Sequence, residues 1–351
     1  MPDNKRVLIT GSNGYIGSVM APWLQGRGYD VVGLDTGYFA QCTLVSDLAN
    51  IPTFQRDIRD VTANDLDGYD AIIHLAALSN DPIGNLNGAW TREINLHGTV
   101  HLAMAAKQAG VSRFILSSSC IMYGMSDAAV VDETAPLAPR TEYARSKAEA
   151  EAALSNLADE RFSPTFCRNG TVYGLSPRMR FDTVLNNLMG EGFTTGQVVI
   201  HSDGTPWRPV VHVQDVARAF GAVLEAPRDL IHNQAFNTGA DDLNHQIRAL
   251  GQIVAETLPG CRLSIRPSAE ADQRTYKADF GKFKRAFPDF RFLWTVRDGA
   301  TELRTAFEGF GLTHAQFTDK RFTRLKWLRH LLDHGMVRGS LRWSEPRKQV
   351  A

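Results

Sequence analysis

The sequence predicts an α/β protein with a doubly wound parallel sheet and a smaller C-terminal lobe. In the first half, short apolar runs alternate with segments of helical hydrophobic period. A glycine-rich turn follows the first run and opens a helix. Strand–helix alternation of this kind favours a parallel sheet with helices on both faces. The expected strands are residues 7–10, 31–35, 71–77 and 113–119, and the two longest expected helices are 91–109 and 142–160.

Charge and cysteine content narrow the class of function. The 351 residues include 38 basic and 38 acidic side chains, so no net field marks the chain for nucleic acid or an anionic membrane. No run approaches the roughly 20 apolar residues of a membrane span. Cys42, Cys120, Cys167 and Cys261 show no CxxC spacing, which argues against a metal site or a disulfide framework. We therefore expect a cytoplasmic protein with no metal and no nucleic-acid or membrane partner.

The glycine-rich turn indicates a dinucleotide site. Gly11, Gly14 and Gly17 allow a sharp turn, a close approach of a pyrophosphate to the backbone, and tight packing of helix on strand. Backbone N–H groups and the helix dipole then hold the pyrophosphate. Asp35 ends the second strand eighteen residues beyond Gly17. A carboxylate there accepts the adenosine ribose hydroxyls and repels a 2′-phosphate, so NAD is the expected cofactor.

Further motifs follow in a fixed order and resemble one family. Together they resemble the extended short-chain dehydrogenases/reductases, the NAD-dependent epimerase/dehydratase family, over about residues 5–310. That resemblance implies a Rossmann-type fold and a nucleotide-sugar substrate whose base stays open. The motifs are Thr10–Gly17, Asp57-Ile58, His74–Ala77, Asn95, Ser117–Ser119 before Tyr123-Gly124, Tyr143–Lys147, Arg168–Gly174 and Arg208–Asp215.

The resemblance also implies two sets of binding residues. The cofactor set is Gly11, Asn13, Gly14, Tyr15, Ile16, Gly17, Asp35, Asp57, Ile58, Leu75, Ala76, Ala77, Asn95, Tyr143 and Lys147. The substrate set is Ser119, Cys120, Asn169, Asn187, Arg208 and Arg274, and Tyr276 is a further candidate. His74 is expected to be a packed strand histidine, and Asn95 to satisfy backbone groups at a helix bend.

Ser119, Tyr143 and Lys147 form the expected catalytic set. A free tyrosine has a pKa of about 10, too high for a base at neutral pH. Lys147 lies four residues after Tyr143, so both side chains lie on one face of a helix. The ammonium and a nearby positive nicotinamide should pull the tyrosine pKa toward neutrality. Ser119 should hydrogen-bond the substrate oxygen.

The residues after Ser119 narrow the reaction. Dehydratases of the family carry an Asp-Glu pair there, and the decarboxylases usually keep the glutamate, whereas this chain has Cys120 and Ile121. Epimerases acting at carbons 3 and 5 place a cysteine at the position of Ile121, and Cys120 is one residue away. A 4-epimerase is therefore the leading expectation. An oxidoreductase or dehydratase of the same family is the alternative, and a non-catalytic NAD-binding protein is the third.

The chain is expected to divide into a cofactor domain, a substrate lobe and a tail. Residues 1–175, with 208–240 returning, form the NAD-binding domain, and residues 176–207 and 241–317 form the lobe. The tail, 318–351, carries nine Lys/Arg against three Asp/Glu and has leucines at helical spacing. We expect it to dock on the body or on a partner subunit rather than anchor to an anionic surface. The helices at 91–109 and 142–160 resemble the pair that forms a homodimer in this family.

Overall fold

A seven-stranded parallel sheet is the centre of the computed structural model, which describes residues 5–44, 48–125, 130–267 and 274–345. The strand order is β10-β6-β5-β4-β1-β2-β3, and every pairing is parallel. The order reverses between β1 and β4, which opens a crevice at their carboxyl ends. The predicted α/β doubly wound fold is confirmed. The strands are β1 (Arg6–Thr10), β2 (Asp30–Asp35), β3 (Thr53–Gln55), β4 (Ala71–His74), β5 (Arg113–Ser119), β6 (Ser163–Asn169) and β10 (Gln234–Thr238).

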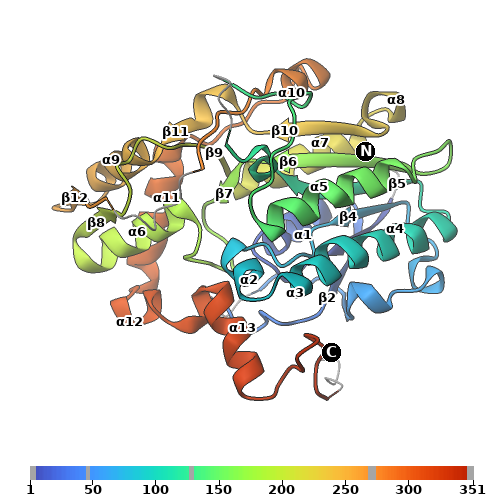
Figure 1. Ribbon diagram of the computed structural model, residues 1–351, viewed down its shortest axis with the longest axis horizontal. Coiled ribbons are helices and arrows are strands. Elements are labelled where there is room, and N and C mark those ends of the chain that lie inside the picture. Colours follow the sequence, from blue (N-terminus) through green and yellow to red (C-terminus); the bar gives the residue numbers. More distant parts are fainter. Residues whose placement is uncertain (1–4, 45–47, 126–129, 268–273, 346–351) are drawn as a thin grey trace.

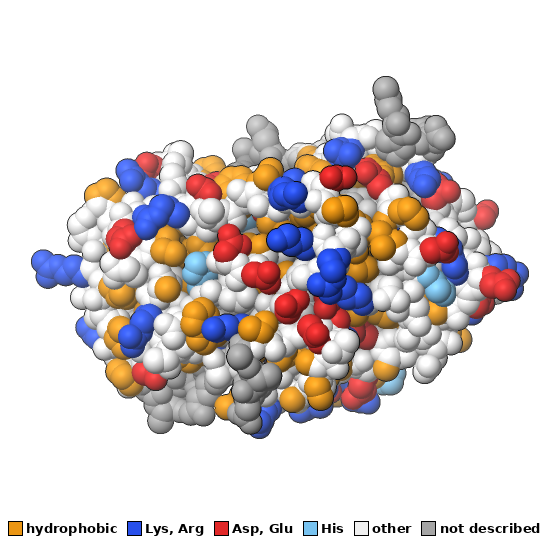
Figure 2. Space-filling model, turned by 90° about the horizontal axis from the view of Figure 1, so that it is seen from above, with side chains coloured by type: hydrophobic (Ala, Val, Ile, Leu, Met, Phe, Trp, Pro, Cys, Tyr) orange, Lys and Arg blue, Asp and Glu red, His pale blue; other side chains and the backbone are white. Residues whose placement is uncertain are grey.

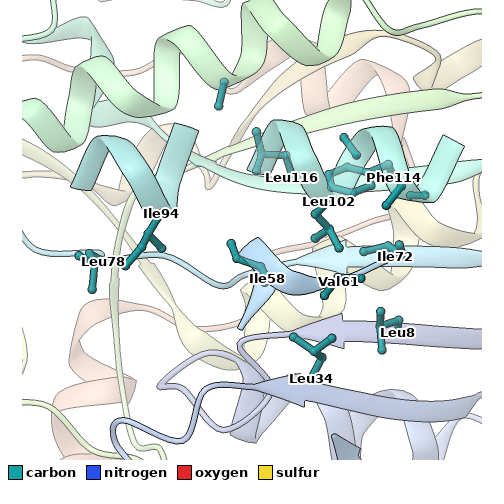
Figure 3. Close-up of a cluster of buried hydrophobic side chains, with 14 of the residues drawn as sticks. Leu8, Leu34, Ile58, Val61, Ile72, Leu78, Ile94, Leu102, Phe114 and Leu116 are labelled. Atoms are coloured by element: carbon teal, nitrogen blue, oxygen red, sulfur yellow. The ribbon is translucent and has the colours of Figure 1, made fainter. Parts of the chain in front are cut away.

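Helices cover both faces of this sheet (Figure 1). On one face lie α4 (Thr99–Gln108) and α5 (Glu142–Ser155), and on the other α1 (Gly17–Gly26) and α7 (Val213–Glu225). Alternate strand residues point to opposite faces, so Leu8 and Ile72 join the first layer while Val7 and Ile73 join the second. Figure 3 shows part of the first layer, in which Leu102 lies near the strand residue Ile72 and Ile94 lies beside Leu78.

Three expected elements have different boundaries in the structure. The helix predicted over 142–160 ends at Ser155. The strand predicted over 71–77 ends at His74, and Leu75–Ala77 form a loop. The helix predicted over 91–109 begins earlier and contains a π-helical segment, Arg92–Gly98, between α3 (Gly88–Thr91) and α4. Such π turns add a residue to one turn and often occur at functional sites. Here the turn contains Asn95.

A smaller lobe lies beside the carboxyl edge of the sheet (Figure 1). Its core is shared by α6 (Val184–Thr195), α9 (Ile247–Thr257) and α11 (Val296–Phe310). Two short sheets belong to it or border it: β8 (Gln197–Ile200) with β12 (Arg262–Ile265), and β7 (Thr171–Tyr173) with β9 (Trp207–His212) and β11 (Asn244–Gln246). The remaining helices are α2 (Asp81–Leu86), α8 (Arg228–Ile231), α10 (Gly281–Ala286), α12 (His314–Phe317) and α13 (Arg324–Asp333).

The C-terminal segment packs on the body of the protein. Trp327, Leu328 and Leu331 on α13 are buried in the same cluster as Leu34 and Tyr38. In Figure 1 this segment lies below α2 and beside the end of β2. A basic helix of this kind therefore buries its apolar face intramolecularly.

The surface carries mixed charge. Figure 2 shows Lys and Arg interspersed with Asp and Glu on the face it presents. Among the described residues, no helix is long and apolar enough to cross a membrane. The same residues contain no group of three or more His, Cys, Asp or Glu side chains that could hold a metal ion.

Candidate active site

A cavity of about 870 Å³ opens at the carboxyl ends of the central strands. Its walls come from the loops after β1, β2, β4, β5 and β6, together with residues of the smaller lobe and of the C-terminal segment. This is the crevice that the reversal of strand order creates. Because the loops belong to parallel strands, residues distant in sequence meet along one edge of the sheet.

The glycine loop leaves room for a phosphate close to the backbone. Gly11 has φ +73°, and a Cβ there would lie 2.7 Å from the backbone N of Ala76. A Cβ on Gly17 would lie 2.3 Å from the carbonyl oxygen of Gly11. Glycine is therefore required at both positions, for conformation and for close packing.

Two backbone N–H groups hold the Asp35 carboxylate, one from the glycine loop and one from the loop after β2. Its carboxylate accepts hydrogen bonds from the backbone N–H of Gly37 at 2.7 Å and of Asn13 at 3.1 Å. Burial raises the pKa of Asp35, and these two bonds, with the charges of Arg178 and Arg324, oppose that rise. The carboxylate is thus fixed at the end of β2, where it could accept hydrogen bonds from the ribose hydroxyls of a bound dinucleotide.

Ser119, Tyr143 and Lys147 all line the cavity. Ser119 ends β5 and accepts a hydrogen bond from the Ile121 backbone N–H at 3.3 Å. Tyr143 lies in the first turn of α5, whose N-cap is Thr141. Lys147, one turn further on, is buried, and its Nζ donates to the Ser117 carbonyl oxygen at 2.7 Å. The structure therefore brings the three predicted catalytic residues to one wall.

Burial dominates the pKa values of Tyr143 and Lys147. Burial raises the pKa of Tyr143 to about 12; Asp81 raises it further, while Arg180 and a hydrogen bond with Ser119 lower it. Burial lowers the pKa of Lys147 to about 8, against the attraction of Glu151. Burial therefore outweighs the lowering of the Tyr143 pKa by Arg180 and Ser119, while Lys147 directs its Nζ to the Ser117 carbonyl oxygen. The predicted lowering of the Tyr143 pKa by the positive charge of oxidised nicotinamide remains a prediction.

Two buried polar side chains, His74 and Asn95, form hydrogen bonds next to the cavity wall. His74 is 0% exposed and lies between the hydroxyls of Thr10 (2.6 Å) and Thr99 (2.8 Å). Asn95 accepts from the Leu78 backbone N–H at 2.8 Å and donates to the carbonyl oxygen of the same residue at 3.1 Å. Asn95 thus fixes the loop after β4 from the π turn.

The predicted binding residues divide into two groups. Four lie outside the cavity wall. Of these, Asn13 and Asn95 act through hydrogen bonds to neighbouring segments. Cys120 is fully buried, with Sγ donating to the Arg168 carbonyl oxygen at 3.0 Å. Asn187 is exposed, since the helix turns its neighbour Asn186 inward instead. The predicted residues that line the cavity are Gly11, Gly14, Tyr15, Ile16, Gly17, Asp35, Asp57, Ile58, Leu75, Ala76, Ala77, Ser119, Tyr143, Lys147, Asn169, Arg208 and Arg274, with Tyr276.

Several cavity residues were missed by the sequence analysis. Asp81 Oδ2 forms a 2.7 Å ion pair with Arg274, and its buried Oδ1 has no hydrogen-bond partner within the described part of the chain. Arg180 donates to the Ser79 hydroxyl at 3.1 Å and pairs with Asp182 at 2.5 Å. Asp81 begins α2, and Arg180 and Asp182 lie in the loop before α6. No distinctive spacing marks them, so only their position after β4 and β7 could have indicated a role.

Comparison with known proteins shows the family. A family model described as "NAD dependent epimerase/dehydratase family" matches residues 7–239. A UDP-glucose 4-epimerase of Mycolicibacterium smegmatis is 31% identical over 67% of this chain and 77% of that protein. UDP-glucuronic acid decarboxylase 4 of Arabidopsis thaliana is 27% identical over 80% of this chain. The match spans 63% of that decarboxylase, less than two thirds of its length.

A solved structure of a similar enzyme has the same fold. The dTDP-glucose 4,6-dehydratase of Streptomyces venezuelae, with NAD bound, superposes with a TM-score of 0.76 at 25% identity, covering 89% of this chain and 99% of that one. The chain belongs to the NAD-dependent epimerase/dehydratase family. That family is described as NAD-dependent, and the structure of the Streptomyces venezuelae dehydratase contains NAD. The residues fit the cofactor: glycines stand where a Cβ would clash, and a fixed carboxylate stands at the end of β2.

Proposed function

We propose that this enzyme is a nucleotide-sugar 4-epimerase. Tyr143 would take the proton of the sugar's 4-hydroxyl as the hydrogen on C4 leaves as hydride, and would return a proton after the keto sugar has rotated. Ser119 would hydrogen-bond the same oxygen. Bound NAD supplies the hydride acceptor and then the hydride donor. Because burial keeps the Tyr143 pKa high, its basicity would depend on the positive charge brought by oxidised NAD.

The residues beside Ser119 carry this proposal. Ile121 lines the cavity and can neither give nor take a proton. Cys120 faces the Arg168 carbonyl, and burial raises the pKa of its thiol well above the ordinary range. The position from which related enzymes drive elimination or decarboxylation therefore offers no acid or base. Oxidation and reduction at one carbon need only Ser119, Tyr143 and Lys147.

Asp81 favours a second candidate, a dehydratase. Its carboxylate lines the cavity and is close enough to Tyr143 to influence the pKa of that phenol. A carboxylate with an unused buried oxygen could remove a proton from a sugar carbon. Its ion pair with Arg274 disfavours this role, since that guanidinium already engages one of the two carboxylate oxygens.

Turnover in D₂O separates these reactions. Purified protein would be incubated with UDP-, dTDP-, GDP- and CDP-hexoses and with UDP-glucuronic acid, and the products identified by NMR. A 4-epimerase gives the C4 epimer without deuterium, because the hydride returns from the cofactor. A dehydratase gives a 4-keto-6-deoxy sugar with deuterium at C5, and a decarboxylase gives a pentose. Either of the last two products would overturn the proposal.

Redox balance gives an independent check. An epimerase returns its hydride to the same substrate, so turnover should need no added NAD and leave no NADH absorbance. Stoichiometric NADH with an oxidised sugar would instead make the enzyme a net oxidoreductase. Asp81→Asn is the matched variant: epimerisation should survive it, whereas a dehydratase that used this carboxylate as its base would lose activity.

We also propose that the enzyme is a homodimer formed through α4 and α5. Met104 on α4 is 56% exposed, which suits a helix that packs against a second copy. Light scattering should give twice the chain mass, and Met104→Glu should lower it. A monomeric unmodified protein would refute this.

A further inference from the structure

The C-terminal segment, residues 318–343, is tied to the loop that follows Asp35. The indole N–H of Trp327 donates to the Tyr38 carbonyl oxygen at 2.6 Å, and that of Trp343 donates to the Thr36 carbonyl oxygen at 2.6 Å. In return, the Tyr38 hydroxyl donates to the carbonyl oxygen of Leu341. Three hydrogen bonds therefore hold the loop directly after the ribose-reading carboxylate.

The same segment contacts Asp57, which with Ile58 belongs to the expected cofactor-binding set. Arg59 donates to the Ser340 carbonyl oxygen at 3.0 Å and also pairs with Asp57 at 2.6 Å. Arg342 approaches Asp57 from the other side, at 3.4 Å. Asp57 is thus held between a cation of its own turn and one from the tail, and both loops around the adenosine end depend on tail contacts.

Arg324, at the start of α13, brings a buried cation to the cavity. It is 4% exposed and lines the cavity with its neighbours Thr323 and Leu325. Its Nη2 donates to the Arg178 carbonyl oxygen at 2.9 Å, and its guanidinium lies 4.5 Å from the ring centre of Phe39. Its Nη1 is buried and has no hydrogen-bond partner among the residues that the structure describes.

The buried positive charge of Arg324 lies near two other arginines, which favours binding of an anion. Burial and the charges of Arg180 and Arg178 lower its pKa to about 10, and Asp182 opposes them. Asp182, however, already accepts from Arg180 and from the Asn80 side chain at 2.7 Å. Arg324 lines the same cavity as Gly14 and Gly17 of the glycine loop. A buried arginine with an unused donor in that cavity suits the pyrophosphate of a dinucleotide.

We propose that residues 318–343 form a strap that retains NAD: Arg324 binds the pyrophosphate, and the segment around Trp343 holds the adenosine loops in their binding conformation. The strap would slow release of the cofactor without taking part in the reaction. This inference rests on the NAD cofactor and not on the proposed 4-epimerase reaction, so the two can fail separately.

The test measures release and affinity rather than turnover. Protein loaded with NAD would be freed of excess nucleotide, and released NAD would be trapped by alcohol dehydrogenase with ethanol and read as NADH. Arg324→Met should speed release by about ten- to hundredfold, the effect of losing a charge-assisted hydrogen bond. Trp343→Phe keeps the ring contacts, removes the bond to Thr36, and should give a smaller increase. Arg329→Met is the matched control, because it removes an exposed cation from the same helix and should change nothing.

A ligand series locates the phosphate. Calorimetry on nucleotide-free protein would compare ADP-ribose, adenosine, NADP and UDP for the unmodified protein and for Arg324→Met. The proposal requires a loss for ADP-ribose that is much smaller for adenosine. Equal losses for both, a loss confined to NADP, or a loss confined to UDP would each overturn it. If Arg324→Met does not fold, Arg324→Lys and Trp343→Phe carry the test, and unchanged release in both would refute the strap.

Discussion

His74 offers a stability prediction whose size can be worked from its surroundings. Burial and the nearby charge of Lys147 lower the pKa of His74 from 6.5 to about 3. The folded protein therefore keeps this imidazole neutral, while the unfolded chain binds a proton below pH 6.5. Stability contributed by neutral His74 is complete above that pH and is lost as pH falls toward 3. One proton changes the free energy of unfolding by about 1.4 kcal/mol per pH unit, which gives a loss of about 2 kcal/mol between pH 6.5 and pH 5.

Urea unfolding of the unmodified protein and of His74→Gln, measured at about pH 7.5 and pH 5, would test this. The glutamine does not titrate, so the stability difference between the two proteins should shrink by about 2 kcal/mol at the lower pH. His97→Gln, which replaces an exposed histidine, controls for the loss of a histidine as such. A difference that does not change with pH would refute the assignment of a neutral, buried His74. Loss of a limb of the pH–rate profile in His74→Gln would instead indicate a catalytic role.

Three further predictions concern the cofactor and the catalytic set. Asp35→Ser should narrow the preference for NAD over NADP, because it removes the repulsion between the carboxylate and the 2′-phosphate of NADP. That repulsion amounts to up to about 4 kcal/mol for charges about 4 Å apart. If NADP bound the unmodified protein more tightly than NAD, the role of Asp35 in cofactor choice would be contradicted. Tyr143→Phe should lower kcat by on the order of 10²–10⁴-fold while calorimetry shows NAD binding unchanged, and Lys147→Met should also weaken NAD binding. Gly17→Ala should cost about 1–3 kcal/mol in thermal or urea unfolding, because its Cβ would meet backbone. Gly26→Ala, in the same helix but with open space around it, should be neutral or stabilising.

The parts of the site that could be predicted are those in which neighbouring residues act together. The spacing of Gly11, Gly14 and Gly17 encodes a turn and a helix start within one short segment. Tyr143 and Lys147, four residues apart, share a helix face whatever the rest of the chain does. Hydrophobic periodicity was less informative for single residues, because an error of one position moves a side chain to another face of its helix or strand. It did not show that Asn186, rather than Asn187, points inward.

The sequence by itself predicted the fold class, which the structure confirms, because strand and helix periods are local properties. It also singled out the glycine loop, Asp35, and the Ser119/Tyr143/Lys147 set, all of which line one cavity, and their roles remain predictions. Only the tertiary structure decided which distant residues share the cavity. Asp81 meets Arg274 across 193 positions, and the carbonyl oxygen of Thr36 meets the indole of Trp343 across 307. Such contacts result from how loops and lobes pack, through many weak interactions that no local pattern records. For the same reason, only the folded chain shows that Arg324 and the glycine loop line the same cavity.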